Sequence, residues 1–361
     1  MGSIFVASVF LINNDGIDDY FVGVSFGGDS MSEAKLLIDR VKSFTNLFVV
    51  QSGPASKNET LLNEICDYAV NAELSIIVYF GKFDLDWQPL WLNNVNDRWG
   101  SKFLGVYFFD EPAGSLLDSI NEMWNESLGP TPKKYNEMAE YFVDSWQSMP
   151  GLKTVRDRLS APMTFTSDYA LYWFDYLAGY DIVLAQFGWN HSRVQDIALI
   201  RGAARSQNKQ WGIIVTWTFD EPPYLEDGEK IYDDLMIAYN NGAKYFVVFN
   251  YPQSNEYGIL TDEHFLAIER FWNQIQNNSE YSPINADSVL VLPKNYGWGM
   301  RRPNDTIWGL WEADEKSAQI WNISRKLLNS YGTKLDIVYD DSNYSIEDKY
   351  SRIFYWNSTF N

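Results

Sequence analysis

The chain has 361 residues, of which 46% are hydrophobic, 17% aromatic and 21% charged. This length is enough for one large domain, or for one large domain and a smaller one. The formal net charge of −20 opposes binding to nucleic acid, whose recognition needs a basic surface.

The start of the chain differs from the rest. Residues 1–3 resemble an expression tag, and the apolar run from Ile4 to Ile12 is too short to span a bilayer. We interpret residues 1–18 as a tag with the remnant of a signal or membrane-anchor segment, the alternative being an N-terminal strand.

Eight Asn-x-Ser/Thr sequences are spread along the chain. They favour an exported glycoprotein, although Asn-rich loops are a second explanation. Together with the acidic balance, they lead us to expect an extracellular or cell-surface location. The asparagines are Asn58, Asn125, Asn190, Asn277, Asn304, Asn322, Asn343 and Asn357.

Residues 19–278 alternate between apolar, strand-like runs and amphipathic, helix-like segments. The runs cover residues 20–26, 47–51, 74–80, 103–109, 161–166, 181–187, 211–219 and 244–250. Eight near-continuous apolar strands followed by helices predict a (β/α)8 TIM barrel. A doubly wound open sheet is the alternative, but the count of eight and the helix after the last strand favour the barrel.

The pattern restarts after a polar, Pro-containing linker that ends near residue 285. Strand-like runs at 288–293, 334–341 and 350–356 flank a helix-like segment that ends before Gly332. Residues 285–361 are therefore expected to form a small flavodoxin-like α/β domain.

Few residues in the chain are suited to metal or thiol chemistry. Cys66 is the only cysteine, and its helix-like surroundings indicate a small core residue rather than a nucleophile. With only His191 and His264 beside it, a zinc site is not expected, whereas a carboxylate calcium site stays open. Dinucleotide and phosphate fingerprints are also missing, so we expect no cofactor.

The sequences FFDEP at 108–112 and TFDEP at 218–222 each close an apolar run. Active sites of these barrels lie at the C-terminal ends of the strands. Asp110 and Glu111 would then meet Asp220 and Glu221 at one mouth, and hydrolysis of a glycosidic bond needs such paired carboxylates. The alternative is that Asp-Glu-Pro caps the helix that follows.

With an acid after strand four and a nucleophile after strand seven, the chain resembles the clan A glycoside hydrolases. A barrel followed by a flavodoxin-like domain also resembles the family that includes certain β-galactosidases. The resemblance implies a retaining glycosidase with Glu111 as acid/base and Glu221 as nucleophile, Asp110 and Asp220 orienting substrate, and a small domain of the trimerisation type that mediates assembly. The whole sequence is similar to exported archaeal barrel proteins.

One departure leaves the mechanism open. The clan usually has Asn before the strand-four Glu, where this chain has Asp110. An Asp-Glu pair there resembles the retaining β-hexosaminidases, in which Asp orients the 2-acetamido group that acts as nucleophile and Glu is the acid.

Amides, carboxylates and aromatic rings near the strand ends are candidate ligands for a carbohydrate substrate, through hydrogen bonds to hydroxyls and stacking on sugar rings. Ordinary loop or core positions are the alternative for each of them. The candidates are Gln51, Tyr79, Tyr169, Gln186, Trp189, Asn190, Trp217, Asp220, Asn250 and Tyr251.

Two other readings compete with a glycosidase. Residues 23–27 match the G-x-S-x-G elbow, with Ser25 as nucleophile and His191 or His264 as base. The match falls on the first strand, whereas several strands precede the elbow in α/β-hydrolases, so core packing is favoured. A non-catalytic glycan-binding or surface-structural barrel would keep the aromatic rim and lack a working acid pair.

Overall fold

The structure is a computed structural model that describes residues 20–118, 131–158, 162–278 and 282–358. Eight parallel strands close into a barrel, each paired with the next in sequence and β8 with β1. They are β1 (Phe21–Phe26), β2 (Leu47–Val50), β3 (Ser75–Gly81), β4 (Phe103–Phe108), β5 (Met163–Asp168), β6 (Ile182–Phe187), β7 (Gln210–Val215) and β8 (Tyr245–Val248). The predicted (β/α)8 barrel is confirmed.

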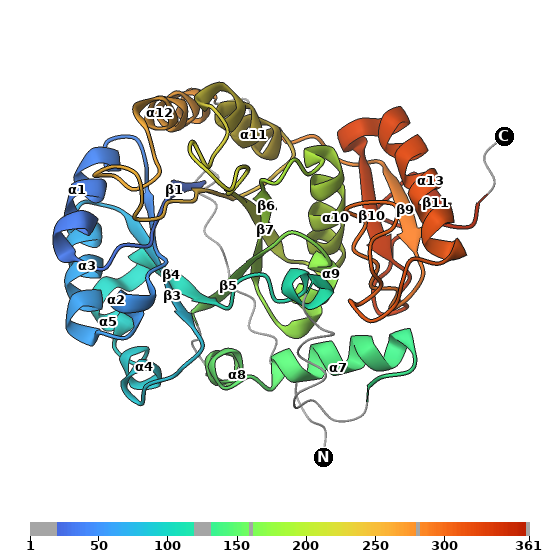
Figure 1. Ribbon diagram of the computed structural model, residues 1–361, viewed down its shortest axis with the longest axis horizontal. Coiled ribbons are helices and arrows are strands. Elements are labelled where there is room, and N and C mark those ends of the chain that lie inside the picture. Colours follow the sequence, from blue (N-terminus) through green and yellow to red (C-terminus); the bar gives the residue numbers. More distant parts are fainter. Residues whose placement is uncertain (1–19, 119–130, 159–161, 279–281, 359–361) are drawn as a thin grey trace, which may run out of the picture.

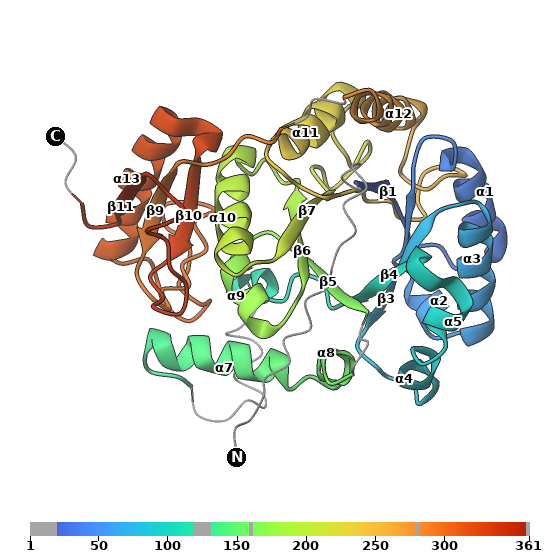
Figure 2. The ribbon, with the colours of Figure 1, turned by 180° about the vertical axis from the view of Figure 1, so that it is seen from behind.

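Helices surround the barrel, as Figure 1 and, from behind, Figure 2 show. The longer ones bury one apolar face against the strands, which is what their amphipathic sequences predict. The described helices of the barrel, long and short, are α1 (Met31–Val41), α2 (Gly53–Ser56), α3 (Glu59–Asn71), α4 (Trp87–Trp91), α5 (Val95–Trp99), α7 (Tyr135–Gln147), α8 (Pro150–Arg156), α9 (Tyr172–Ala178), α10 (Arg193–Ser206), α11 (Gly228–Asn240) and α12 (Asp262–Gln276). A 3-10 turn, Gly100–Lys102, precedes β4.

Both faces of the barrel strands are apolar, because one faces the helices and the other fills the interior. Inside the barrel, the rings of Phe165 and Tyr245 meet edge to face at 5.3 Å. Gly105 lets β4 and β5 approach closely, since a Cβ there would lie 2.1 Å from the carbonyl oxygen of Met163. The barrel is thus a filled core, and a ligand can be held only at its ends.

The strands lie close to their predicted bounds except at the end of β7. The apolar run predicts a strand to Phe219, but β7 ends at Val215. The amides of Thr218 and Phe219 both donate to the carbonyl oxygen of Tyr224, at 2.8 and 3.0 Å, and so close a local turn instead of extending the sheet. The expectation that Asp220 and Glu221 directly end a strand was therefore wrong.

The C-terminal residues form a three-stranded parallel sheet in the order β10-β9-β11. Its elements are β9 (Ser288–Leu292), α13 (Glu315–Tyr331), the 3-10 turn Gly332–Lys334, β10 (Leu335–Tyr339) and β11 (Arg352–Tyr355). Asp314 begins α13 with a capping box, and Gly332, at φ 54°, ends it.

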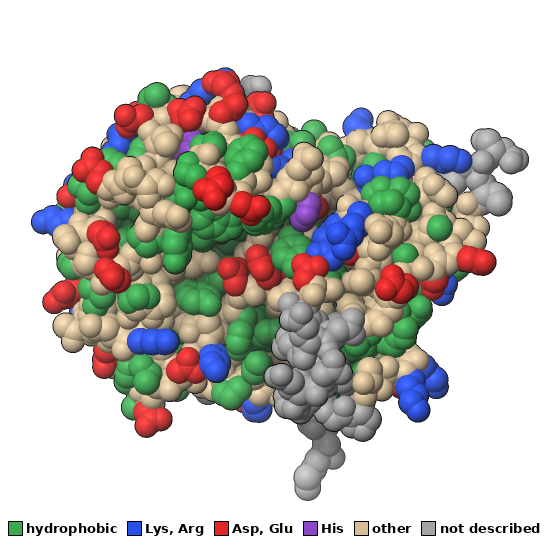
Figure 3. Space-filling model, viewed as in Figure 1, with side chains coloured by type: hydrophobic (Ala, Val, Ile, Leu, Met, Phe, Trp, Pro, Cys, Tyr) green, Lys and Arg blue, Asp and Glu red, His purple; other side chains and the backbone are tan. Residues whose placement is uncertain are grey.

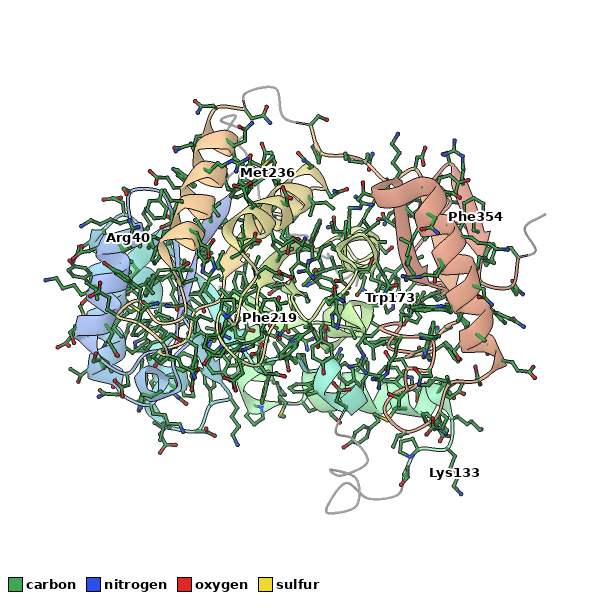
Figure 4. All side chains as sticks on the ribbon, turned by 45° about the horizontal axis from the view of Figure 1, so that its top comes forward. Arg40, Lys133, Trp173, Phe219, Met236 and Phe354 are labelled. Atoms are coloured by element: carbon green, nitrogen blue, oxygen red, sulfur yellow. The ribbon has the colours of Figure 1, made fainter. Side chains whose placement is uncertain are left out.

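The small sheet packs directly on the barrel. The buried Arg201 of α10 donates from Nε to Oδ1 of the buried Asp336 on β10 at 2.8 Å. Gly202 allows this contact, because a Cβ there would lie 2.6 Å from the carbonyl oxygen of Ile337. Trp173, labelled in Figure 4, lies at the same junction, with its ring 5.8 Å from that of Tyr339.

Among the described residues, no helix is both long enough and apolar enough to cross a bilayer. The tag and the signal or anchor remnant predicted at residues 1–18 lie outside the part of the chain that the structure describes.

Candidate active site

Asp110 and Glu111 lie just past the end of β4, at a sharp bend of the backbone. Phe109 and Glu111 both adopt left-handed conformations, with φ of 52° and 56°. Side chains with a Cβ rarely adopt this region, and such strain concentrates at functional positions. The bend is held where the amide of Glu111 donates to the carbonyl oxygen of Ser167 on β5, at 2.8 Å.

Asp110 is held through one of its two carboxylate oxygens. Its Oδ1 lies 2.5 Å from the hydroxyl of Tyr107 and 2.6 Å from Oγ of Ser167, and these two hydroxyls are 2.8 Å apart. Loss of hydration raises the pKa of Asp110, and the hydrogen bonds from Ser167 and Tyr107 oppose that rise. Oδ2 makes no hydrogen bond with a described residue, which leaves it available to a ligand.

Glu111 is fixed by Gln186, which is buried on β6. Nε2 of Gln186 donates to Oε1 of Glu111 at 2.8 Å and to Oγ of Ser167 at 3.0 Å. Desolvation, followed by the negative charge of Asp110, raises the pKa of Glu111, and Asp118 adds to the rise. A carboxyl group whose pKa is raised in this way is suited to general acid catalysis.

The segment after Glu111 is anchored by Asp168 at the end of β5. The buried carboxylate of Asp168 accepts the amides of Ala113 at 2.7 Å and Gly114 at 2.9 Å, together with those of Tyr169 and Ala170. Gly114 is needed for this close approach, because a Cβ there would lie 2.6 Å from Oδ1 of Asp168. Asp168 thus fixes the backbone that follows Glu111, without a contact to the Glu111 side chain among the described hydrogen bonds.

Asp220 and Glu221 lie in the exposed turn between β7 and α11. The carbonyl oxygen of Glu221 accepts the amide of Tyr224 at 3.0 Å, but neither carboxylate makes a hydrogen bond or an ion pair with a described residue. No described contact joins this turn to Glu111. Phe219, in the same turn, is labelled in Figure 4.

Several predicted ligands do lie at the rim. Trp189 and Tyr251 have 43% and 48% of their surface exposed, which leaves both rings open to a ligand. Asn190 is exposed beside Trp189. The half-buried ring of Trp217 packs 6.2 Å from that of Tyr251, and that of Tyr79 lies 5.4 Å from Tyr107.

Three other predicted ligands are buried or half-buried in the protein, or have a buried polar atom. Asn250 is buried, and its Oδ1 accepts the amide of Ile259 at 3.0 Å, which indicates a structural role. Tyr169 is half-buried and donates to Oδ2 of Asp118 at 2.6 Å. Gln51 follows β2, and its Oε1 is buried without a hydrogen-bond partner.

The rival nucleophiles Ser25 and Cys66 are enclosed, and so is His264, one of the two candidate bases. Ser25 is buried, and its Oγ accepts the amide of Asn250 at 3.0 Å. His264 is buried in the capping box of α12. Cys66 is buried in α3, where desolvation raises the pKa of its thiol. Within the described parts of the chain, no three His, Cys, Asp or Glu side chains gather to hold a metal ion.

The residues that hold the carboxylates, Tyr107 and Ser167, were not among the sequence-predicted site residues. Ser167 did carry a signal, since a small hydroxyl beside Asp at the end of an apolar strand has no packing role. The face viewed in Figure 3 is hollowed near its centre, with apolar side chains in the hollow and acidic ones along its rim.

No family model matches the chain, and no curated protein matches it in sequence. Among solved structures, a β-galactosidase from the Antarctic haloarchaeon Halorubrum lacusprofundi is similar, with a TM-score of 0.59 at 10% identity, over 93% of this chain and 68% of that one. The α-L-fucosidase isoenzyme 2 from Paenibacillus thiaminolyticus gives a TM-score of 0.58 at 11% identity. That match covers 92% of this chain but only 59% of the fucosidase. At such identities the likeness establishes a shared fold alone.

Proposed function

We propose that the protein is a glycosidase that cleaves a glycosidic bond of a carbohydrate substrate at the Asp110–Glu111 end of the barrel. The observation that carries the proposal is the clamp on these two carboxylates, formed by Tyr107, Ser167 and Gln186. Such a clamp fixes the geometry that general acid catalysis needs. The fold shared with a β-galactosidase and a fucosidase is in keeping with this activity.

Glu111 is the proposed general acid. Because Nε2 of Gln186 donates to Oε1, the proton of the neutral carboxyl group belongs on Oε2, the oxygen left free to reach the substrate. Glu111 gives this proton to the leaving oxygen as the bond to the anomeric carbon breaks, and then accepts a proton from the attacking water.

The nucleophile has two candidates. In the first, the turn between β7 and α11 moves inward and the carboxylate of Glu221 attacks the anomeric carbon, while Asp220 orients the substrate. In the second, the carbonyl oxygen of a 2-acetamido group of the substrate attacks, and Oδ2 of Asp110 accepts its N–H. The second is favoured by two observations: Oδ2 of Asp110 is free, and β7 ends at Val215 without a carboxylate beside it.

We further propose that the enzyme works outside the cell, in keeping with its acidic balance and its Asn-x-Ser/Thr sequences. An acidic surface keeps an exported protein soluble. Mass spectrometry of the protein from its native source tests this, because attached glycans on those asparagines require export.

The activity test is hydrolysis of a panel of aryl glycosides and natural glycans, with and without a 2-acetamido group. The variants are Glu111→Gln, Asp110→Asn and Glu221→Gln, and Glu140→Gln on the outer helix α7 is the matched control. We expect Glu111→Gln to lose about 10²-fold or more in rate, and Glu140→Gln to keep full activity.

The other two variants separate the nucleophiles. A comparable loss in Glu221→Gln identifies an enzymatic nucleophile. A loss in Asp110→Asn but not in Glu221→Gln, limited to N-acetylated substrates, identifies substrate assistance. If nothing is hydrolysed while glycans bind, the protein is a non-catalytic glycan-binding barrel and the proposal fails.

A further inference from the structure

A cavity of about 540 Å³ adjoins the Asp110–Glu111 site on the side of the C-terminal domain. Trp189 and His191, from the loop between β6 and α10, line one wall. Arg301 and Arg302, which follow β9, and Arg325 of α13 line the other. Figure 3 shows basic side chains between the central hollow and the C-terminal domain.

Asp118 and Tyr169 also line the cavity, and both lie near Glu111, with which each interacts electrostatically. The hydroxyl of Tyr169 donates to Oδ2 of Asp118 at 2.6 Å. Asp118 is close enough to Glu111 for its charge to contribute to the raised pKa of that carboxyl group. A substituent of a glycan bound at Glu111 is therefore close enough to reach the cavity.

Arg301 forms part of the wall, and its charge is already paired with two carboxylates. Its Nη1 lies 2.9 Å from both carboxylate oxygens of Asp118, and its Nε and Nη2 bond to Asp305 at 2.8 and 2.7 Å. Arg301 thus ties the C-terminal domain to the segment that follows Glu111.

Arg302 and Arg325 are different, because neither pairs with a described acidic group. The exposed side chain of Arg302 makes no hydrogen bond with a described residue, while its carbonyl oxygen accepts the amide of Asp305 at 3.1 Å. Nε and Nη2 of Arg325 are buried without a hydrogen-bond partner. A guanidinium group binds carboxylate or sulfate through charge-assisted hydrogen bonds, and Arg325 lines the cavity without an ion-pair partner among the described residues.

Asp196 acts electrostatically on Arg325 but does not form an ion pair with it. Asp196 is 3% exposed and lines the cavity, and its Oδ2 is also buried without a partner. No ion pair joins it to Arg325 among the described contacts. Desolvation raises the pKa of Asp196 to about 8, which leaves it uncharged near neutral pH. Burial, with Arg301 and Arg193, lowers the pKa of His191, so this ring adds no charge.

A partly buried charge without an ion-pair partner is costly, and an anion bound close to it recovers part of that cost. We propose that this cavity binds an anionic substituent, a carboxylate or a sulfate, on the glycan whose glycosidic bond lies at Asp110 and Glu111. Arg302 and Arg325 bind the anion, and the exposed ring of Trp189 stacks on the sugar that carries it. The inference deepens the proposed function, since it specifies an acidic glycan as substrate.

Binding is measured without turnover, by calorimetry on the intact Glu111→Gln protein at constant salt. The probes are a hexuronate-containing oligosaccharide, a sulfated oligosaccharide and their neutral counterparts. At least one acidic probe is expected to bind about tenfold or more tightly than its neutral counterpart, as charge-assisted hydrogen bonds imply. Preference for the hexuronate identifies a carboxylate as the substituent, and preference for the sulfated probe identifies a sulfate.

Arg302→Gln is the decisive variant, because its exposed side chain can change without disturbing the fold. It should lose about tenfold in affinity for the acidic probe and none for the neutral one. Lys326→Gln, an equal loss of charge next to Arg325 on the exposed side of α13, is the control and should change neither. Equal effects in both variants, or equal affinities for acidic and neutral probes, would overturn the inference.

The two proposals fail separately. If the protein hydrolyses neutral glycosides but binds acidic and neutral probes equally, the glycosidase proposal is supported and the anionic subsite is contradicted. If the protein binds acidic probes more tightly but hydrolyses no glycoside, the anionic subsite is supported and the glycosidase proposal is contradicted.

Discussion

Gln186 on β6 donates from Nε2 to Oε1 of Glu111, 2.8 Å away at the end of β4. This hydrogen bond crosses the end of the barrel between two strands that are not neighbours, with Ser167 of β5 bonded to the same nitrogen. It opposes the rise in the pKa of Glu111 that desolvation and Asp110 produce. Gln186 therefore helps to fix the position of the Glu111 carboxyl group and keeps its pKa from rising further.

Replacing Gln186 should move the pH profile of the reaction. In Gln186→Leu the pKa of Glu111 rises further, because the carboxylate loses a donor. A general acid works while it is protonated, so the alkaline limb of kcat/KM against pH should shift to higher pH, with a lower maximum. Gln207→Leu, at the far end of α10, should leave the profile in place. An unchanged limb in Gln186→Leu would argue against Glu111 as the acid.

Removing the hydroxyl of Tyr107 should lower kcat, because Asp110 loses an orienting contact, while the stability of the fold changes little. Tyr107→Phe keeps the buried ring and loses the contact with Oδ1 of Asp110. We expect kcat to fall about 10- to 100-fold, as for other lost orienting contacts. Tyr180→Phe also loses one buried hydroxyl hydrogen bond, to the carbonyl oxygen of Phe108, and should keep kcat. Thermal unfolding of both variants should change to a similar, small extent.

The anchor at Asp168 should matter for stability. Asp168→Ala leaves several buried amides, including those of Ala113 and Gly114, without an acceptor. The free energy of unfolding should fall by about 3 kcal/mol or more, since unsatisfied buried groups cost about 1–3 kcal/mol each. Asp262→Ala breaks an exposed pair with Arg40 and should cost less than about 1 kcal/mol. Urea unfolding measures both, and equal losses would contradict the anchor role.

Asp196 should make the fold less stable as the pH rises. Its pKa is about 8 in the folded protein against an ordinary value of 3.8. Between these values the folded state holds a proton that the unfolded state has lost, so the stability that this group contributes falls with pH. The slope is at most about 1.4 kcal/mol per pH unit. Asp196→Asn removes it.

Urea unfolding of Asp196→Asn and wild type at several pH values between 4 and 8 tests this prediction. All other groups cancel in the difference between the two proteins. The advantage of the variant should therefore grow steadily with pH, and a difference that stays constant would show that Asp196 is already ionised in the folded state.

The junction between the barrel and the small sheet should depend on Asp336. Asp336→Ala leaves Arg201 buried without its acidic partner and also removes the acceptor of the Tyr350 hydroxyl. Breaking a buried pair on one side costs about 3–5 kcal/mol. Glu229→Ala, which removes an exposed pair with Arg270, should cost less than about 1 kcal/mol. Calorimetric unfolding compares them, and similar small losses would mean that apolar packing alone holds the junction.

The carboxylates of β4 could be predicted because they directly follow a strand whose apolar run defines where it ends. The same argument misplaced Asp220 and Glu221, because the run from Trp211 to Phe219 continues through a turn that the carbonyl oxygen of Tyr224 closes. Apolar residues after β7 pack against other rings, as Trp217 does against Tyr224 at 5.3 Å. Hydropathy does not distinguish such packing from strand pairing.

The sequence by itself determined the barrel and the small α/β sheet, because their repeating pattern of apolar strands and amphipathic helices is a local property of the chain. Only the tertiary structure decided which side chains hold Asp110 and Glu111, since Tyr107, Ser167 and Gln186 come from three different strands. It alone also joined Trp189 to Arg302 and Arg325 around one cavity. Contacts between residues so far apart in sequence depend on how the closed barrel packs against the C-terminal domain, and no local pattern encodes that.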